Sequence, residues 1–437
     1  MNEIVSNLLV YGSLPEDSIL WQLADICEKL KNQTETKAAL RTRVFHQVKN
    51  LLTVATDYAF DKNLWHNYLT FLLITNENPF SLVCEKMGAQ DGTVNNFVTH
   101  DFDMFKELFD YDFSWLEKEL SIDCFTQLTH YQAIRKKELM YNKNVSEKVR
   151  TLSEKLEIAK SGADFFKYVT EFYKDFGVGM FGLNKAFRIA ENGDGSVRFL
   201  PINNMDAVML DDLIGYELQK KKLVENTQAF CDGKAANNVL LFGDSGTGKS
   251  TSIKAIVNQF YPQGLRMIEI YKHQFKDLST IIAQIKNRNY KFIIYMDDLS
   301  FEEFEIEYKF LKAVIEGGVE TKPDNVLIYA TSNRRHLIKE TWKDREDMEH
   351  SEDLHRSDTM EEKLSLVNRF GLSIYYAKPN KEGFNEMAVA LARRAGITPE
   401  TMSDEEICYE ANRFEMRGGG LSGRTAQQFA NYLLTIK

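Results

Sequence analysis

The stretch Gly243-Asp244-Ser245-Gly246-Thr247-Gly248-Lys249-Ser250 fits the pattern G-x-x-x-x-G-K-[ST]. An apolar run, 239–242, precedes this loop and a helix-compatible run, 251–260, follows it. The glycines allow a tight turn whose backbone N–H groups converge on phosphate oxygens, and the positive end of the following helix dipole points to the same place. The loop and its context therefore predict binding of a nucleoside triphosphate.

Two side chains of the loop have specific expected roles. Lys249 is expected to reach the β- and γ-phosphates, and the hydroxyl of Ser250 is expected to bind Mg²⁺. The expected nucleotide-binding residues of this segment are Gly243, Asp244, Ser245, Gly246, Thr247, Gly248, Lys249, Ser250 and Thr251. The alternative is a glycine-rich turn that binds nothing, which the strand before it and the helix after it disfavour.

From about residue 209 the chain alternates short apolar strands with helical stretches. The expected strands are Val239–Phe242, Arg266–Ile270, Phe292–Met296, Val326–Ala330 and Ser373–Tyr376. The expected helices between and before them are Leu218–Phe230, Ser250–Gln259, Leu278–Lys286 and Tyr308–Glu316. This alternation predicts a parallel sheet that is covered on both faces and binds its ligand at the carboxyl ends of the strands.

Two of these strands run into polar side chains that suit phosphate chemistry. The strand at 292–296 is followed by Asp297, which is expected to hold the hydration shell of Mg²⁺, and by Asp298, which is expected to orient or deprotonate a water molecule. The strand at 326–330 leads to Asn333, whose amide can bind the γ-phosphate or that water. The alternatives are a core strand that enters a polar loop and an asparagine that caps a helix.

In combination these motifs resemble the AAA+ ATPase superfamily and, more narrowly, the bacterial ATPases grouped as domain of unknown function 815. The resembling segments are 211–217, 297–302, 362–366 with 369–371, and 421–424, and the resemblance covers roughly residues 180 to 437. It implies an α/β fold: an AAA+ P-loop NTPase core, a parallel sheet flanked by helices, with a C-terminal helical lid and an N-terminal, mostly helical domain.

The resemblance also implies site residues that spacing alone would not indicate. Ile214, Gly215 and Tyr216 stand where AAA+ proteins line the adenine pocket. Arg369 matches the arginine finger that reaches the γ-phosphate of a neighbouring subunit, and a surface salt bridge is its alternative role. Arg424 matches the second sensor, an arginine at the start of a lid helix.

The implied catalytic set is therefore Asp298, Asn333, Arg369 and Arg424, with ATP and Mg²⁺ as ligands and with Ser250 and Asp297 as the metal-binding residues. In one position the chain departs from the commonest AAA+ pattern. Asp298 stands where that pattern has glutamate, a form that bacterial replication initiators and helicase loaders share.

The length of 437 residues is expected to divide into four parts: a mostly helical domain at 1–180 that could bind a partner, a β-hairpin junction at 181–208, the ATP-binding core at 209–378 and the helical lid at 379–437. The aromatic side chains of the first part are expected to form a core, with a groove for a partner as the alternative: Trp65, Tyr68, Phe71, Phe165 and Phe166. The acidic segment 340–362, with its two histidines, is expected to be a solvated loop rather than a metal site.

Composition excludes several other classes of protein. The five cysteines are scattered and form no C-x-x-C pair, which disfavours a disulfide framework or a zinc site and suits a reducing cytoplasm. There is no long uninterrupted apolar run and no secretory signal at the start, so no membrane segment is expected. The net charge of −10 argues weakly against a protein that wraps nucleic acid.

The leading functional expectation is Mg²⁺-dependent ATP hydrolysis that couples nucleotide state to conformational change or assembly on an unknown protein client, in an ATP-dependent homo-oligomer. One alternative is a DNA-linked helicase loader or initiator, which the acidic charge balance disfavours. A second is a nucleotide-gated, protein-binding scaffold with little turnover. A kinase is the third, and the arginine and sensor positions disfavour it.

Overall fold

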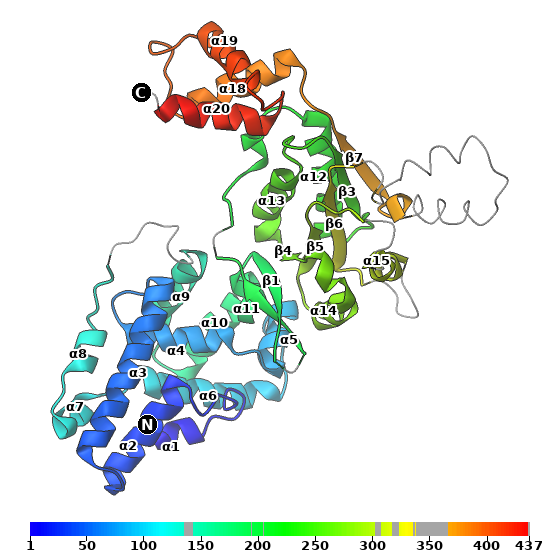
Figure 1. The fold of residues 1–437 in the computed structure, drawn as a ribbon. Helices are drawn as coiled ribbons and strands as arrows, with labels where there is room; N and C mark the ends of the chain where they lie inside the picture. The colour runs from blue at the N-terminus through cyan, green and yellow to red at the C-terminus, as the bar shows by residue number, and fades with distance from the viewer. Residues whose placement is uncertain are drawn as a thin grey trace. The chain divides into compact units, whose positions relative to one another are not determined.

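The computed structural model divides into two compact units, Met1–Asn184 and Lys185–Lys437 (Figure 1). It describes residues 1–134, 143–193, 195–203, 205–301, 307–316, 323–334, 337 and 366–435. The acidic segment expected to be a solvated loop at 340–362 lies outside the described residues, as do 135–142 and 362–365. The division of the chain into four parts stays a prediction.

The first unit is built of helices that share one hydrophobic core. Trp65, Tyr68 and Phe165 are buried in this core, and Phe71 and Phe166 pack against it, so the aromatic core expected from the sequence is confirmed. The helices are α1 (Asn2–Ser6), α2 (Ile19–Asn32), α3 (Lys37–Tyr58), α4 (Leu64–Thr75), α5 (Pro79–Met87), α6 (Val94–Phe109), α7 (Ser114–Leu120), α8 (Cys124–Leu128), α9 (Lys143–Glu157), α10 (Gly162–Phe176) and α11 (Gly179–Leu183).

A buried carboxylate attaches the N-terminal segment of this unit to α6. Asp101 has no exposed surface, and its two oxygens accept the backbone N–H groups of Leu9, Val10 and Tyr11 at 2.9, 2.7 and 2.9 Å. A charge can be buried in this way because several donors replace the water that it loses. Asp101 therefore fixes a segment about ninety residues away in the sequence.

Replacement of Asp101 by Ala is expected to lower the free energy of unfolding by about 3 kcal/mol, because three buried N–H groups lose their acceptor at once. Urea unfolding followed by circular dichroism measures this loss. Asp91→Ala, at an exposed position, is the matched control and should change stability little. Equal stabilities of the two variants would contradict the anchoring role.

The second unit contains a sheet in which, among the described residues, seven strands follow the order β2-β1-β4-β5-β6-β3-β7. The strands are β1 (Ala186–Glu191), β2 (Val197–Pro201), β3 (Val239–Gly243), β4 (Leu265–Glu269), β5 (Lys291–Met296), β6 (Val326–Ser332) and β7 (Leu372–Tyr376). All neighbours pair in parallel except β1 with β2. The parallel sheet expected from the alternating pattern is thus confirmed, and each of its five expected strands is present.

The hairpin at 186–201 extends this sheet at one edge. Its first strand, β1, pairs in parallel with β4, with Phe187 opposite Ile268, while β2 forms the antiparallel outer strand. The Asn-Gly turn and the alternating runs predict the hairpin itself. They do not predict its place in the sheet, because a short alternating run carries no information about which distant strand it pairs with.

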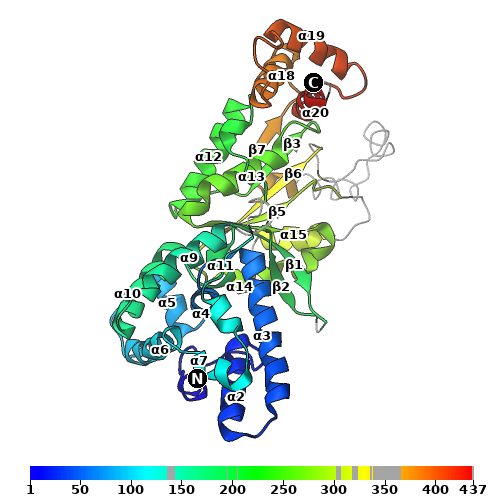
Figure 2. The same ribbon diagram turned by 90° about the vertical axis from the view of Figure 1, so that its left-hand side faces the viewer.

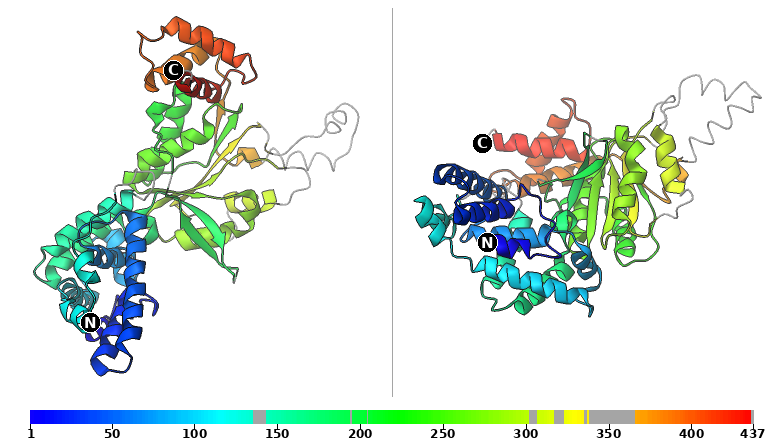
Figure 3. Two further views of the ribbon diagram at one scale, coloured as in Figure 1. Left: turned by 60° about the vertical axis from the view of Figure 1, so that its left-hand side comes forward. Right: turned by 90° about the horizontal axis from the view of Figure 1, so that it is seen from below.

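Helices cover both faces of the sheet, as Figures 1 and 2 show. The side chains of α12 (Glu217–Cys231) and α13 (Lys249–Phe260) share a core with β3, β5 and β7 on one face. On the other side lie α14 (Leu278–Ile285) and α15 (Glu307–Glu316). Both views in Figure 3 show the strands as one twisted sheet between these layers.

The C-terminal helices form a lid with a small core of its own. They are α18 (Lys381–Arg394), α19 (Asp404–Glu415) and α20 (Gly423–Thr435). Ile214 and Tyr216, from the segment before α12, pack against this core. The segment that the resemblance assigns to the adenine pocket therefore contacts the lid. In the described part of the chain, no helix is both long enough and apolar enough to cross a membrane.

Candidate functional site

The glycine-rich loop lies between β3 and α13, at the carboxyl end of β3. Two of its glycines are required by geometry. Gly243 has φ +133°, and a Cβ there would lie 2.2 Å from the carbonyl oxygen of Tyr376, while Gly248 has φ +90°. Since α13 begins at Lys249, the free N–H groups of its first turn and its positive dipole end face the loop. The loop therefore has the form of an anion-binding nest.

The ammonium group of Lys249 is buried within this loop. Its Nζ donates to the carbonyl oxygens of Gly243 at 3.0 Å and Asp244 at 2.6 Å, and to Asn333 Oδ1 at 3.0 Å. Burial lowers the pKa of Lys249, and the nearby carboxylates of Asp244 and Asp298 act in the opposite direction. A cation that is held by neutral oxygens in a nest of N–H groups suits an incoming phosphate.

The two acids that follow β5 lie beside this lysine. Ser250 Oγ donates to Asp297 Oδ1 at 2.7 Å, and Thr331 Oγ1 donates to the same oxygen at 2.5 Å. Burial alone would raise the pKa of Asp297, but these hydrogen bonds outweigh burial and lower it. The Asp298 carboxylate accepts a hydrogen bond from Asn333 Nδ2 at 2.8 Å. Lys249 and Asp298 are therefore connected through the amide of Asn333.

These residues fit a Mg²⁺ ion. The hydroxyl of Ser250 and the carboxylate of Asp297 are hard oxygen ligands, and Mg²⁺ in phosphate sites commonly takes one or two such ligands with phosphate and water. The hydroxyl of Tyr295 is buried beside the same carboxylate and has no hydrogen bond of standard geometry within the described residues. The Tyr295 hydroxyl is therefore a polar group beside the expected ion, and an ordered water molecule can form a hydrogen bond with it.

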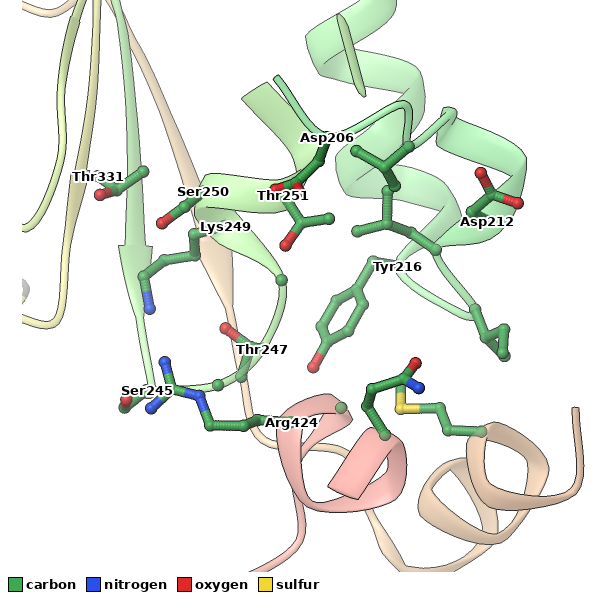
Figure 4. A pocket seen from close by; sticks show the side chains of 18 of the residues that line it. Asp206, Asp212, Tyr216, Ser245, Thr247, Lys249, Ser250, Thr251, Thr331 and Arg424 are labelled. Carbon is green, nitrogen blue, oxygen red and sulfur yellow. The ribbon is translucent and has the colours of Figure 1, made fainter. Parts of the chain in front are cut away.

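A cavity of about 840 Å³ extends from the loop to the lid. Figure 4 shows Lys249, Ser250 and Thr331 on the sheet side of this cavity, with the ring of Tyr216 at its other end. The cavity brings together these residues expected from the sequence: Ile214, Tyr216, Ser245, Gly246, Thr247, Gly248, Lys249, Ser250, Thr251, Asp297, Asp298, Asn333 and Arg424. Gly243, Asp244 and Gly215 adjoin its lining, and their backbone shapes it.

Both apolar and polar side chains line the end of the cavity away from the loop, among them Leu213, Met387 and Asp212. Tyr216 has φ +60°, its ring stacks on Tyr376 with centroids 5.0 Å apart, and its hydroxyl donates to the carbonyl oxygen of Ala377 at 2.8 Å. Gly215, with φ +78°, passes so close to the lid that a Cβ would lie 3.3 Å from Met387 Cε. This geometry fixes the tyrosine ring beside the cavity, where Ile214 and Met387 also contribute apolar side chains to the lining.

Sequence reasoning missed part of the lining. The missed residues are Asp206, Val208, Asp212, Leu213, Thr331, Met387, Leu391, Gly423, Gln427 and Gln428. Most of them come from the lid or from the segment before α12, which meet only in the folded chain. For Thr331, its place at the end of the strand that leads to Asn333 is a signal in the sequence that indicates its proximity to the site.

The lid contacts the nucleotide-binding segments directly. The backbone N–H of Arg424 donates to the carbonyl oxygen of Gly246 at 3.1 Å, and Figure 4 shows the Arg424 side chain extending along the loop. From α18, Arg394 donates to the carbonyl oxygens of Asp212 at 2.6 Å and Asp211 at 2.8 Å. The lid therefore contacts both the glycine-rich loop and the segment before α12.

Arg369 lies away from this cavity and is not among the described residues that line it. It is in the turn before β7, which runs parallel to β3 with Leu372 opposite Val239 and Tyr376 opposite Gly243. The amino end of β7 is at the opposite end of the strands from the glycine-rich loop, because the four residue steps from Leu372 to Tyr376 span roughly 13 Å at about 3.3 Å per residue. The structure does not bring Arg369 to the site of its own chain.

Three adjacent parallel strands thus lead into the site: β5 into the two acids, β6 into the asparagine and β3 into the glycine-rich loop. The helical lid lies across the cavity that these groups line. This is the P-loop fold of the AAA+ class. A family model described as "Protein of unknown function (DUF815)" matches residues 183–436, more than half of the chain. The chain belongs to this family.

Among solved structures, the chain is similar to two variants of RuvB from Thermotoga maritima. The first is 17% identical, with 52% of this chain and 65% of that chain covered and a TM-score of 0.36. The second is 15% identical, with 52% of this chain and 71% of that chain covered and a TM-score of 0.33. The chain spans less than two thirds of the first of them. No curated protein matches the chain.

Proposed function

We propose that this chain binds ATP with Mg²⁺ and hydrolyses it, and that the nucleotide state controls the lid and the assembly of copies of the chain. The observation that carries this proposal is the continuous hydrogen-bonded set formed by Lys249, Asn333 and Asp298, with Ser250 and Asp297 beside it. A phosphate-binding cation, a metal-binding pair and an acid that can accept a proton are the groups that phosphoryl transfer to water requires.

In this proposal the γ-phosphate takes the place of the carbonyl and amide oxygens that now hold Lys249. Ser250 and Asp297 would hold Mg²⁺, which would offset negative charge on the phosphate oxygens. Asp298 accepts a proton from the attacking water, and Asn333 orients that water or the γ-phosphate. Most of the rate gain then comes from positioning and electrostatics, since phosphoryl transfer needs little covalent help.

The end of the cavity away from the loop would take the adenine base, beside Ile214, Tyr216 and Met387 of the lid. The volume of the whole cavity, about 840 Å³, is within the range of pockets for small-molecule ligands. Arg424 would report the nucleotide state to the lid, because its backbone already contacts the phosphate loop. The helical first unit is the part of the chain that we propose binds a protein client.

We further propose that Arg369 acts on the nucleotide of a second copy of the chain. Its position just before β7, at the opposite end of the strands from the loop, supports this, because Arg369 is not among the described residues that line the cavity of its own chain. In the second copy it would offset charge on the transferring phosphoryl group. Hydrolysis would therefore depend on assembly.

Replacement of Lys249 by Ala is expected to weaken ATP binding about a hundredfold, because the phosphates lose a buried cation. Isothermal titration calorimetry with ATP and Mg²⁺ measures the dissociation constant. Lys221→Ala, an exposed lysine on α12, is the matched control and should bind as the unmodified chain does. Unchanged affinity of Lys249→Ala would refute nucleotide binding at this loop.

A further inference from the structure

Thr331 contacts three consecutive residues of the turn that carries the two acids. Its Oγ1 donates to Asp297 Oδ1 at 2.5 Å and accepts the backbone N–H of Asp298 at 2.9 Å. Its carbonyl oxygen accepts the N–H of Leu299 at 2.7 Å. The residue is 2% exposed, so water does not compete for these hydrogen bonds. One residue at the end of β6 therefore determines the position of the whole acidic turn.

The backbone of Asp298 is in an unfavourable conformation. Its φ of +50° lies in the left-handed region, which costs a residue with a Cβ about 1 kcal/mol or more. The hydrogen bond from its N–H to the Thr331 hydroxyl holds the residue there, and the carboxylate then meets Asn333 Nδ2 at 2.8 Å. The direction of the Asp298 carboxylate thus depends on the hydroxyl of Thr331.

The role of the Thr331 hydroxyl differs from that of the Ser250 hydroxyl, which also donates a hydrogen bond to Asp297. In the proposed complex Ser250 would be a ligand of Mg²⁺. Thr331, at the end of β6, would remain as a hydrogen-bond donor to Asp297. A hydroxyl can donate to one acid and accept from the next residue at the same time, which an isosteric methyl group cannot do.

We propose that Thr331 is a positioning residue for ATP hydrolysis: its hydroxyl holds Asp297 at the metal and holds Asp298 in the strained conformation that aims its carboxylate at the attacking water. This inference rests on the proposed function, and it adds a residue of the cavity lining whose hydroxyl is engaged by the two acids. Its effect is transmitted entirely through the two acids.

The test compares Thr331→Val, which keeps the shape and removes the hydroxyl, with Thr331→Ser, which keeps the hydroxyl and removes the methyl group. Steady-state hydrolysis is measured over a range of ATP and of Mg²⁺ concentrations. For Thr331→Val we expect kcat to fall about 30-fold, an unchanged KM for ATP and a higher Mg²⁺ requirement, since a small misplacement of catalytic groups can cost about a hundredfold. Thr331→Ser should hydrolyse ATP at nearly the rate of the unmodified chain.

Ser332→Ala is the matched control, because this neighbouring buried hydroxyl accepts the N–H of Arg334 and, within the described residues, makes no hydrogen bond to either acid. It should leave hydrolysis unchanged. If Thr331→Val does not fold, Thr331→Ala replaces it with the same expectations. Full activity without the hydroxyl, or equal losses in the Ser and Val variants, would overturn the positioning role. An inactive unmodified chain would instead contradict the proposed function, so the two failures are distinguishable.

Discussion

Replacement of Asp298 by Asn is expected to reduce the rate of ATP hydrolysis by about 10²–10⁴-fold, because a positioned general base contributes this much. ATP affinity should stay unchanged, since Asp298 bonds to Asn333 and makes no hydrogen bond to the glycine-rich loop within the described residues. Asparagine tolerates the left-handed backbone conformation of this position, so the turn should keep its shape. Phosphate release and ATP titration on the same preparation measure both quantities.

The matched control is Asp324→Asn, an exposed acid just before β6, at the edge of the sheet away from the loop. This substitution removes the same negative charge as Asp298→Asn does, and it should leave the rate of ATP hydrolysis unchanged. Hydrolysis by Asp298→Asn at the rate of this control would show that another group takes the proton. A parallel loss of affinity and rate would place Asp298 in binding instead of catalysis.

Replacement of Arg369 by Ala is expected to reduce hydrolysis by about 10³-fold while each chain still binds ATP, because an arginine supplied by a partner is worth about 10³–10⁵ in such reactions. The reason lies in its place before β7, away from the cavity of its own chain. Phosphate release and ATP titration again separate the two effects. Arg417→Ala, at an exposed position of the lid, is the control.

A mixing experiment shows whether Arg369 acts between copies. Lys249→Ala removes the nucleotide from one copy but leaves its Arg369, while Arg369→Ala keeps an intact pocket. Each variant alone should be inactive, and a mixture should recover part of the activity, because the pocket of one receives the arginine of the other. Full activity of Arg369→Ala alone would exclude an arginine finger at this position, and inactivity of every mixture would contradict its action between copies.

The parts of the fold that local sequence determines could be predicted well. β3, the glycine-rich loop and α13 follow one another along the chain, so their periodicity and turn chemistry define them without knowledge of other segments. The acids after β5 and the asparagine after β6 could be placed near the loop because parallel strands end at a common edge. The structure brings these groups within hydrogen-bond distance of one another.

The features that could not be predicted are contacts between segments distant in the sequence. Arg394 is one of several basic residues on its helix, and nothing local indicates that it binds the carbonyl oxygens of residues 211 and 212. The Thr331 hydroxyl matters only because β6 lies beside β5. Likewise, the amphipathic helices of the first unit predict its core but not a ligand. The spacing of apolar residues indicates which side chains are buried and does not indicate what the surface binds.

The central claim is that the chain hydrolyses ATP at a site completed by a second copy, and the most direct test is Mg²⁺-dependent ATP hydrolysis per chain over a wide range of protein concentration. We expect the specific activity to rise with concentration and then to level off as the copies assemble, with the Lys249→Ala variant inactive throughout. A specific activity that is substantial but independent of concentration would contradict completion between copies. Activity near zero at every concentration, with ATP bound, would contradict autonomous hydrolysis and indicate a nucleotide switch.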